Sequence, residues 1–97
     1  MYILVSGPEG RPVELTWDAW EHVQERHPEM TERLRDIVLT IEHPDHREPD
    51  AKPGTERLFK RTDPDLWMRV VIEFNWEFER VVTAFLQSRD SRPGRSR

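Results

Sequence analysis

The chain has 97 residues, 35% of them hydrophobic and 35% charged, and a formal net charge of −4. A chain of this length builds one hydrophobic core, so the sequence predicts a single domain. The absence of cysteine excludes disulfides, thiolate nucleophiles and cysteine-bound zinc, and without a signal-peptide pattern or an apolar run of roughly 20 residues we expect a cytoplasmic protein with no membrane span.

Charge is unevenly distributed along the chain. The last ten residues, SRDSRPGRSR, hold four Arg and one Asp, a balance of +3, which leaves −7 for the rest. We therefore divide the sequence into a domain over 1–87 and a basic, flexible tail over 88–97. An acidic body excludes coating of nucleic acid by bulk positive charge, because such binding needs many phosphate contacts from Lys and Arg. A local cationic site is still allowed.

A hairpin followed by a helix is predicted first. Residues 1–5 and 13–15 are apolar and β-prone, and the Gly and Pro residues between them, over 6–12, favour a turn. Thr16 is a candidate N-cap for the helix, which must end before Pro28 because proline disfavours helical geometry at the preceding residue.

A second helix and three strands are predicted next. Apolar residues recur every three or four positions between 30 and 41, which predicts an amphipathic helix that ends at His43. The segment 44–54 is polar and has no period, so we expect a surface loop. Strands are predicted over 56–61, 66–74 and 80–87, with turns at 62–65 and 75–78.

The strand over 66–74 has the clearest alternation. Its even positions are all apolar, whereas Arg69 and Glu73 occupy odd positions on the side away from the core. The strand over 80–87 is apolar on both faces, so we expect it near the centre of the sheet. Its two faces are predicted to carry Val82, Ala84 and Leu86 on one side and Val81, Thr83 and Phe85 on the other. The predicted fold class is α+β, with an N-terminal hairpin and two helices on one face of an antiparallel sheet.

Motifs spread over most of the chain resemble one known family. They are GRPVELTWDAWEHVQERHPEM, IEHPD, RLFKR, RVVIEF, VVTAF and RPG, and the series W-x-H-V-x-x-x-H-P-E, then P-D, then V-x-T-A-F is the most specific part. The chain resembles the phage-type nuclease-like proteins of the barnase, EndoU, colicin and RelE (BECR) fold group of small bacterial proteins. The resemblance implies a barnase/RelE-like fold and metal-free or toxin-like cleavage of RNA. The sequence departs from that group in its acidic body, since such nucleases are usually basic.

Cleavage of RNA without a metal needs a base for the 2′-hydroxyl, an acid for the departing 5′-oxygen, and fixed cations around the phosphorus. Arg69 and Arg61 are the candidates to hold phosphate, Glu73 or His22 to exchange protons, and Thr83 to position the phosphate. Arg69 and Glu73 are about 13 Å apart along a strand at ~3.3 Å per residue, so one phosphodiester would struggle to contact both. The alternative for this pair is an outward sheet face with ion pairs between strands.

Further cations that could bind substrate are Arg57, Lys60 and Arg26. Which of Arg57, Lys60 and Arg61 faces the site depends on whether Leu58 or Phe59 enters the core, and alternation alone leaves this open.

His27 and Trp20 share the apolar face of the first helix, so both are predicted to be structural. We expect His27 to be buried and bound to backbone near the helix junction. His43 and His46, with nearby Asp residues, could ligate a metal, but no HExxH or similar motif supports this, and no metal site is predicted.

Two hypotheses for function follow. The first is a metal-independent endoribonuclease or toxin-like RNA-cleaving protein that uses no cofactor, with an antitoxin or immunity protein as a further partner. The alternative is a catalytically silent protein-binding module or homodimer on the same fold. In that case exposed Trp67 or Trp76 would anchor the interface, because aromatic residues dominate such contacts.

Overall fold

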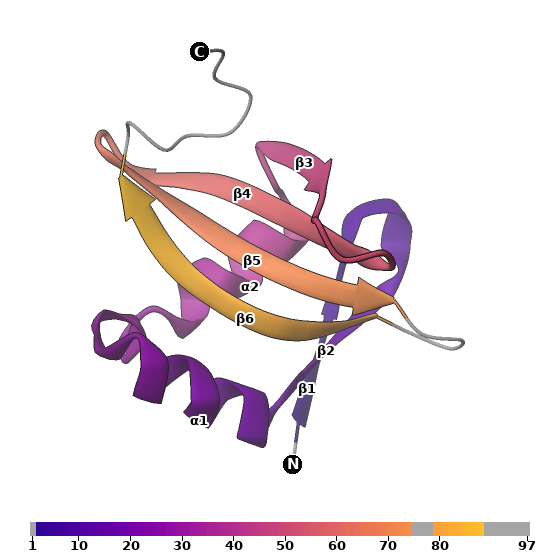
Figure 1. Ribbon diagram of the computed structural model, residues 1–97, viewed down its shortest axis with the longest axis horizontal. Helices are drawn as coiled ribbons and strands as arrows, with labels where there is room; N and C mark the ends of the chain where they lie inside the picture. The colour runs from indigo at the N-terminus through magenta and orange to yellow at the C-terminus, as the bar shows by residue number, and fades with distance from the viewer. Residues whose placement is uncertain (1, 75–78, 89–97) are drawn as a thin grey trace.

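The computed structural model describes residues 2–74 and 79–88, and it is α+β as predicted (Figure 1). The strands are β1 (Tyr2–Ser6), β2 (Pro12–Thr16), β3 (His46–Pro49), β4 (Thr55–Asp63), β5 (Leu66–Phe74) and β6 (Glu79–Ser88). The helices are α1 (Trp17–Arg26) and α2 (Leu34–Glu42), with 3-10 turns at Pro8–Gly10 and Pro28–Met30. The predicted turn over 75–78 and, apart from Ser88 at the end of β6, the basic tail lie outside the described residues.

The N-terminal elements confirm the prediction. Strands β1 and β2 form an antiparallel hairpin in which Val5 lies opposite Val13. Thr16 caps α1, since its side-chain oxygen accepts a hydrogen bond from the backbone N–H of Ala19 at 3.0 Å. Helix α1 ends at Arg26, two residues before Pro28, as the restriction on the residue before proline requires.

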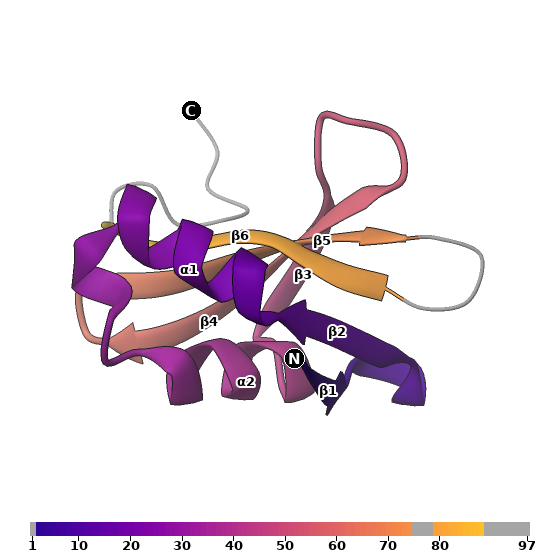
Figure 2. The same ribbon diagram turned by 90° about the horizontal axis from the view of Figure 1, so that it is seen from below.

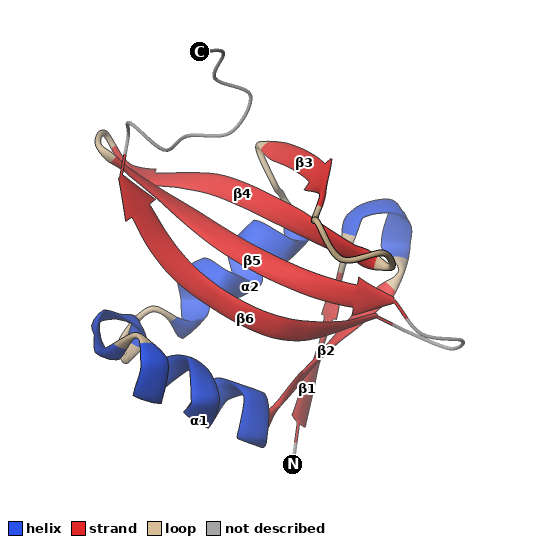
Figure 3. Cartoon of the chain, in the orientation of Figure 1, coloured by secondary structure: helices blue, strands red, loops and turns tan. Residues whose placement is uncertain are grey.

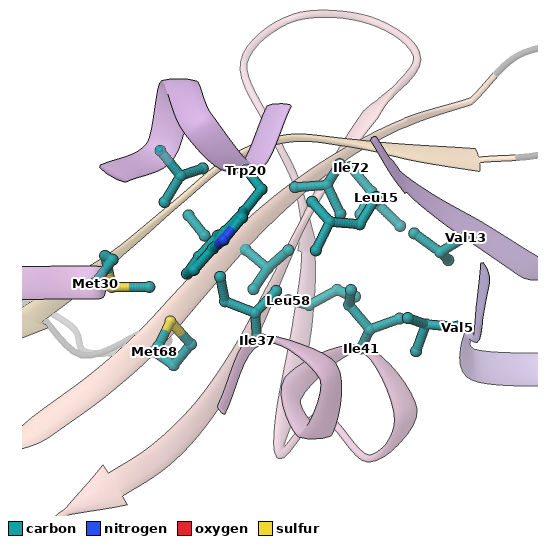
Figure 4. Packing of buried hydrophobic residues seen from close by; sticks show 14 residues of the cluster. Val5, Val13, Leu15, Trp20, Met30, Ile37, Ile41, Leu58, Met68 and Ile72 are labelled. Carbon is teal, nitrogen blue, oxygen red and sulfur yellow. The ribbon is translucent and has the colours of Figure 1, made fainter. Parts of the chain in front are cut away.

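The core lies between the helices and one face of the sheet (Figure 4). Helix α2 contributes Ile37 and Ile41 from its apolar face, and both are fully buried. Strand β5 contributes Met68, Val70 and Ile72, whereas the even positions at its two ends, Leu66 and Phe74, are only partly buried. The buried cluster comprises Val5, Val13, Leu15, Trp20, Val23, Met30, Ile37, Ile41, Leu58, Met68, Val70, Ile72, Val81 and Ala84.

The six-stranded sheet is mixed, so the prediction of a wholly antiparallel sheet is wrong. Its strand order is β1-β2-β6-β5-β4-β3 (Figure 3), and β2 pairs with β6 in parallel through Val13–Glu79 and Glu14–Arg80. The remaining neighbours are antiparallel. Periodicity shows which residues are extended but not which strand lies beside which, and β6 reaches β2 only after both helices and three strands have intervened.

Strand β3 was also missed, because the sequence predicts a loop over 44–54. It pairs antiparallel with β4 at the edge of the sheet and has the sequence HREP. Four residues with three ionisable side chains and a proline show no hydrophobic alternation, and such composition is typical of a protected edge strand.

A β-bulge changes the predicted faces of β6. The β5–β6 register shifts between Val71 and Ile72, so that Val81 packs in the core while Val82 is 42% exposed. The predicted grouping of Val81 with Thr83 and Phe85 is therefore wrong. An extra residue in one strand reverses the alternation, which a strictly two-residue pattern cannot anticipate.

The two helices lie differently against the sheet. Figure 1 shows α2 behind β4 and β5, whereas α1 lies alongside β6, which pairs with β2 only at its first two residues. Figure 2 shows the same arrangement from below, with α2 under the strands and α1 beside them. We call the side of β3–β6 away from α2 the open face. Within the described residues no helix lies across it.

At the junction of β2 and β6, the carboxylate of Glu79 is buried, with 5% of its side chain exposed. Its partner is Arg11, whose Nε lies 3.2 Å away and whose side chain is half exposed. Burial raises the pKa of Glu79 above its ordinary value, and the charge of Glu56 raises it further, while Arg11 opposes both effects. The folded protein therefore holds this proton more tightly than the unfolded chain does.

Replacing Glu79 by glutamine is expected to alter how stability depends on pH. Because the folded pKa is raised, Glu79 lowers the free energy of unfolding as pH rises from the ordinary value of 4.5 through the folded value. The free energy of unfolding is measured in urea at pH 4.5 and at pH 7. The value for Glu79→Gln minus that for the native chain should be larger at pH 7. The control is Glu21→Gln, at an exposed position on α1. A Glu79→Gln advantage that shrinks toward pH 7 would contradict the burial argument.

Candidate functional site

Four residues on adjacent strands form a row across the open face. Leu58 is the residue of β4 that enters the helix-side core, which places Phe59 on the open face opposite Arg69 of β5. Arg69 in turn lies opposite Phe85 of β6, and Phe59 lies opposite His46 of β3. Side chains of paired residues project from the same face, so the row brings the predicted Arg69 together with three residues that were not predicted.

The guanidinium of Arg69 lies between two aromatic rings. Its Cζ is 5.1 Å from the centre of the Phe85 ring and 5.8 Å from that of Phe59, both within cation–π range. Phe59 is 2% exposed although it is on the open face, so its ring forms a buried support beneath the cation. Burial, and next the charge of Arg57, lower the pKa of Arg69, but an arginine stays protonated at neutral pH.

His27 is not buried as predicted. About a third of its side chain is exposed, and its ring stacks on Phe85 with centroids 5.2 Å apart and an interplanar angle of 27°. It reaches the open face because α1 runs beside β6 and ends next to it. Both the His27 ring and the Arg69 guanidinium carbon lie about 5 Å from the centre of the Phe85 ring, so they are at most about 10 Å from each other. A histidine therefore ends the row on the β6 side.

His46 ends the row on the β3 side. Its ring centre is 5.9 Å from that of Phe59, and its Nε2 lies 3.0 Å from Oε1 of Glu48. His46 was considered only as a metal ligand. Among the described residues no group of three or more His, Asp or Glu side chains is arranged to hold a metal ion.

A second arginine, Arg57, lies beside the row and is held by carboxylates from the end of β3. Its Nη2 is 2.9 Å from Glu48 Oε2, and its Nε is 3.3 Å from Asp50 Oδ1. The same Asp50 oxygen lies 3.7 Å from Arg69 Nη2, so one carboxylate bridges two guanidinium groups. The Nε atoms of both arginines are nonetheless buried without a hydrogen-bond acceptor.

Glu73, a predicted base, lies further along the open face, and its carboxylate is already bound by two cationic side chains. Its Oε1 accepts hydrogen bonds from Arg80 Nη2 at 2.7 Å and from Nε at 3.0 Å, and its Oε2 accepts one from Lys52 at 3.2 Å. The bond from Arg80, followed by that from Lys52, lowers the pKa of Glu73. These ion pairs are the cross-strand alternative considered for this residue, and they make it a poor proton acceptor.

Beside Glu73 the surface is hollowed. The hollow has a volume of about 340 Å³ and is lined by Thr16, Ala19, Lys52, Glu73, Arg80, Val81 and Val82. It lies between the start of α1 and the loop before β4, at the end of the open face away from Arg61.

The other predicted residues are spread over the molecule. Arg61 shares the open face but is exposed, and its Nη2 donates to Pro64 O at 3.0 Å. Thr83 is partly exposed on the open face opposite Val71. Lys60 projects the other way and donates to His43 O at 2.9 Å.

Two predicted residues on α1, His22 and Arg26, are exposed, and no described contact joins either to the row. Trp20, on the same helix, lies in the core. Of the predicted catalytic residues only Arg69 lies in the row, and of the predicted substrate-binding residues only Arg57 lies beside it.

The sequence could have revealed some of the missing residues. Phe59 shares its parity with Arg57 and Arg61, so choosing Leu58 for the core would have put it beside Arg69. Glu48 and Asp50 lie in the segment that was predicted as a loop, where no pattern indicates a partner.

No helix in the described parts of the chain is long and apolar enough to cross a membrane. Comparisons with protein-family models, with curated proteins and with solved structures gave no match. The likeness to the BECR group therefore rests on the sequence motifs alone.

Proposed function

We propose that the chain is a metal-independent endoribonuclease of the BECR type, with a barnase/RelE-like fold, and that it binds single-stranded RNA on the open face. The observation that carries the proposal is the row in which the Arg69 guanidinium lies between two aromatic rings and a histidine ends each side. Metal-free RNA cleavage requires proton transfer and a cation that stabilises the phosphorane, which His27 and Arg69 would supply, and the aromatic rings beside them can stack on bases.

Binding would centre on Arg69 and Phe85. The Nη atoms of Arg69 lie 3.4 Å from Gln87 Oε1 and 3.7 Å from Asp50 Oδ1, and they would exchange these partners for a phosphate. The buried ring of Phe59 holds the guanidinium in place. Phe85 is only partly buried, so its ring and that of His27 offer a surface to the neighbouring nucleoside. Splayed, unpaired bases can stack there, whereas the bases of a duplex cannot.

The chemistry would use His27 in place of His22 or Glu73. In this mechanism His27 takes the proton of the 2′-hydroxyl, the 2′-oxygen attacks phosphorus, and the bond to the 5′-oxygen breaks. A proton donor then protonates the 5′-oxygen, leaving a 2′,3′-cyclic phosphate and a 5′-hydroxyl. Arg69 stabilises the negative charge that develops on the phosphorane oxygens. His46 is separated from Phe85 by three strand spacings of about 4.8 Å, too far to protonate the same 5′-oxygen, so a water molecule is the candidate proton donor.

The test is cleavage of a single-stranded RNA oligonucleotide in excess chelator. We expect products that end in 2′,3′-cyclic phosphate, and no cleavage when the 2′-hydroxyl is replaced by hydrogen. Replacing His27 by alanine should lower the rate by about 100-fold or more, a typical contribution of a general acid or base. The matched control is His22→Ala, on the same helix but exposed and outside the row, which should cleave like the native chain. Intact RNA after incubation with the native protein would refute the proposal.

A catalytically silent binding module is the second candidate. It is favoured by the fact that Arg57, Arg69 and Arg80 each already have a carboxylate partner on the open face. Trp67 is partly buried there, opposite Arg61, and Trp76 lies outside the described residues. An antitoxin or immunity protein, or a second copy in a homodimer, would cover this face. A dimer in size-exclusion chromatography that is lost in Trp67→Ala or Trp76→Ala, together with no cleavage of RNA, would support the silent module.

A further inference from the structure

The positions of Asp50, Arg57 and Arg69 differ from those of a simple ion pair. A single oxygen, Asp50 Oδ1, lies 3.3 Å from Arg57 Nε and 3.7 Å from Arg69 Nη2. Two guanidinium groups that converge on one oxygen form the arrangement by which proteins hold a phosphate, because each can donate two parallel hydrogen bonds to it. Asp50 is the one carboxylate shared between them, while Glu48 Oε2 and Pro49 O hold Arg57 alone, through its Nη2 at 2.9 and 3.0 Å.

The carboxylate also leaves the arginines incompletely satisfied. The Nε atoms of Arg57 and Arg69 are buried, and neither makes a hydrogen bond. A phosphodiester has two unesterified oxygens spread around a tetrahedral centre, so it can reach donors that a planar carboxylate at this angle does not. Both guanidinium groups project from the same face, since Arg57 pairs with Val71 and Arg69 with Phe59 in the β4–β5 register.

The Asp50 side chain can move away from the two arginines and leave room for a ligand between them. Figure 1 shows the connection from β3 to β4 crossing in front of β4, and Figure 2 shows it rising on the side away from α2. Its backbone is anchored, because Asp50 N donates to Thr55 O at 3.1 Å. Apart from its ion pairs with the two arginines, at 3.3 and 3.7 Å, the side chain has one described hydrogen bond, a long one of 3.5 Å from Thr55 Oγ1. A change of side-chain rotamer therefore moves the carboxylate while β3 stays paired with β4.

We propose that Arg57 and Arg69 form a phosphodiester-binding pair, and that Asp50 occupies it as an internal substitute for phosphate and so lowers the affinity for RNA. This inference rests on the proposed function, because it takes the ligand to be RNA. It assigns Arg57 a direct role in binding, and it assigns Asp50, directly after β3, a regulatory role.

The experiment measures binding of a short 2′-O-methyl oligoribonucleotide, which lacks the nucleophilic hydroxyl and stays intact. Asp50→Asn should bind about tenfold more tightly than the native chain, because the competing charge is removed. The slope of log affinity against log salt should steepen by about 0.7, the value for one further phosphate contact on a single strand. Adding Arg57→Ala to Asp50→Asn should remove the gain.

Two further variants make the outcome decisive. Asp63→Asn removes the same charge where Asp63 faces Arg33, so it controls for net charge. Asp50→Ser is a second test in case the asparagine disturbs the contact with Thr55, and urea unfolding checks that each variant is folded.

The outcomes separate this inference from the proposed function. If Asp50→Asn and Asp50→Ser bind no more tightly than Asp63→Asn while the native chain cleaves RNA, this inference is wrong and the proposed function is supported. If they bind more tightly but nothing is cleaved, the inference of a phosphodiester-binding pair is supported and the proposed nuclease function is wrong. If no variant binds the oligonucleotide, both the inference and the proposed function are wrong.

Discussion

Replacing Arg69 by alanine is expected to reduce RNA cleavage by about 100- to 1000-fold, the usual loss when one preorganised donor to a developing oxyanion is removed. Arg69 is the only residue of the row that carries a permanent positive charge, and its guanidinium is fixed between the rings of Phe59 and Phe85. No rearrangement is then needed as charge moves onto the phosphorane. Initial rates on a defined oligonucleotide, for kcat and KM separately, measure the effect.

Two controls separate this role from a structural one. Arg69→Lys keeps the charge but not the planar fork, so it should recover only part of the rate. Arg26→Ala removes an arginine from the exposed surface of α1, and its rate should stay within a few-fold of the native value. A contribution to the chemical step should appear mainly in kcat. A pure loss of affinity, seen as a raised KM at native kcat, would contradict the assigned role.

Phe59→Ala is expected to lower the free energy of unfolding by about 3–5 kcal/mol, the usual cost of deleting a buried phenylalanine side chain. This cost is unusual for the face of a sheet that carries no helix. Phe59 is 2% exposed because His46 and Arg69 pack against its ring from the two neighbouring strands. Since a domain of this size has a total stability of roughly 5–15 kcal/mol, the loss would leave a large fraction unfolded at moderate urea concentrations.

The comparison for Phe59→Ala is Val82→Ala, since Val82 is on the same sheet but 42% exposed. It should change stability by no more than about 0.5 kcal/mol, apart from its small effect on strand propensity. Equilibrium urea unfolding followed by tryptophan fluorescence gives both values. Equal losses in the two variants would mean that the open face does not bury Phe59 in solution.

Much of the fold could be predicted from local patterns. The hairpin, the Thr16 cap, both helices and strand β5 are each determined by neighbouring residues, through turn formers, capping geometry or a period of 3.6 or 2. The errors concern properties that depend on distant residues. The parallel pairing of β2 with β6, the edge strand β3 and the bulge at Val82 result from how separate segments meet.

The candidate site was predictable to a lesser degree, for the same reason. Arg69 was identified because alternation in β5 shows which side it faces. His27 was placed in the core because the helical period puts it on the apolar face of α1, but that helix ends beside β6, where the last turn reaches the open face. Asp50 could not be recognised, since its role comes from the approach of one oxygen to two strands that follow it in the chain.

The parallel contact between β2 and β6 also constrains the order in which the chain can fold. Strands β4, β5 and β6 are consecutive and antiparallel, so their pairing closes only short segments and has a small entropic cost. By contrast, joining Val13 to Glu79 encloses both helices and three strands, and the β2–β6 ladder in the described residues has two residue pairs. We therefore expect the C-terminal meander to form early and the N-terminal hairpin to dock late, so that the rate of folding is set by this one long-range closure.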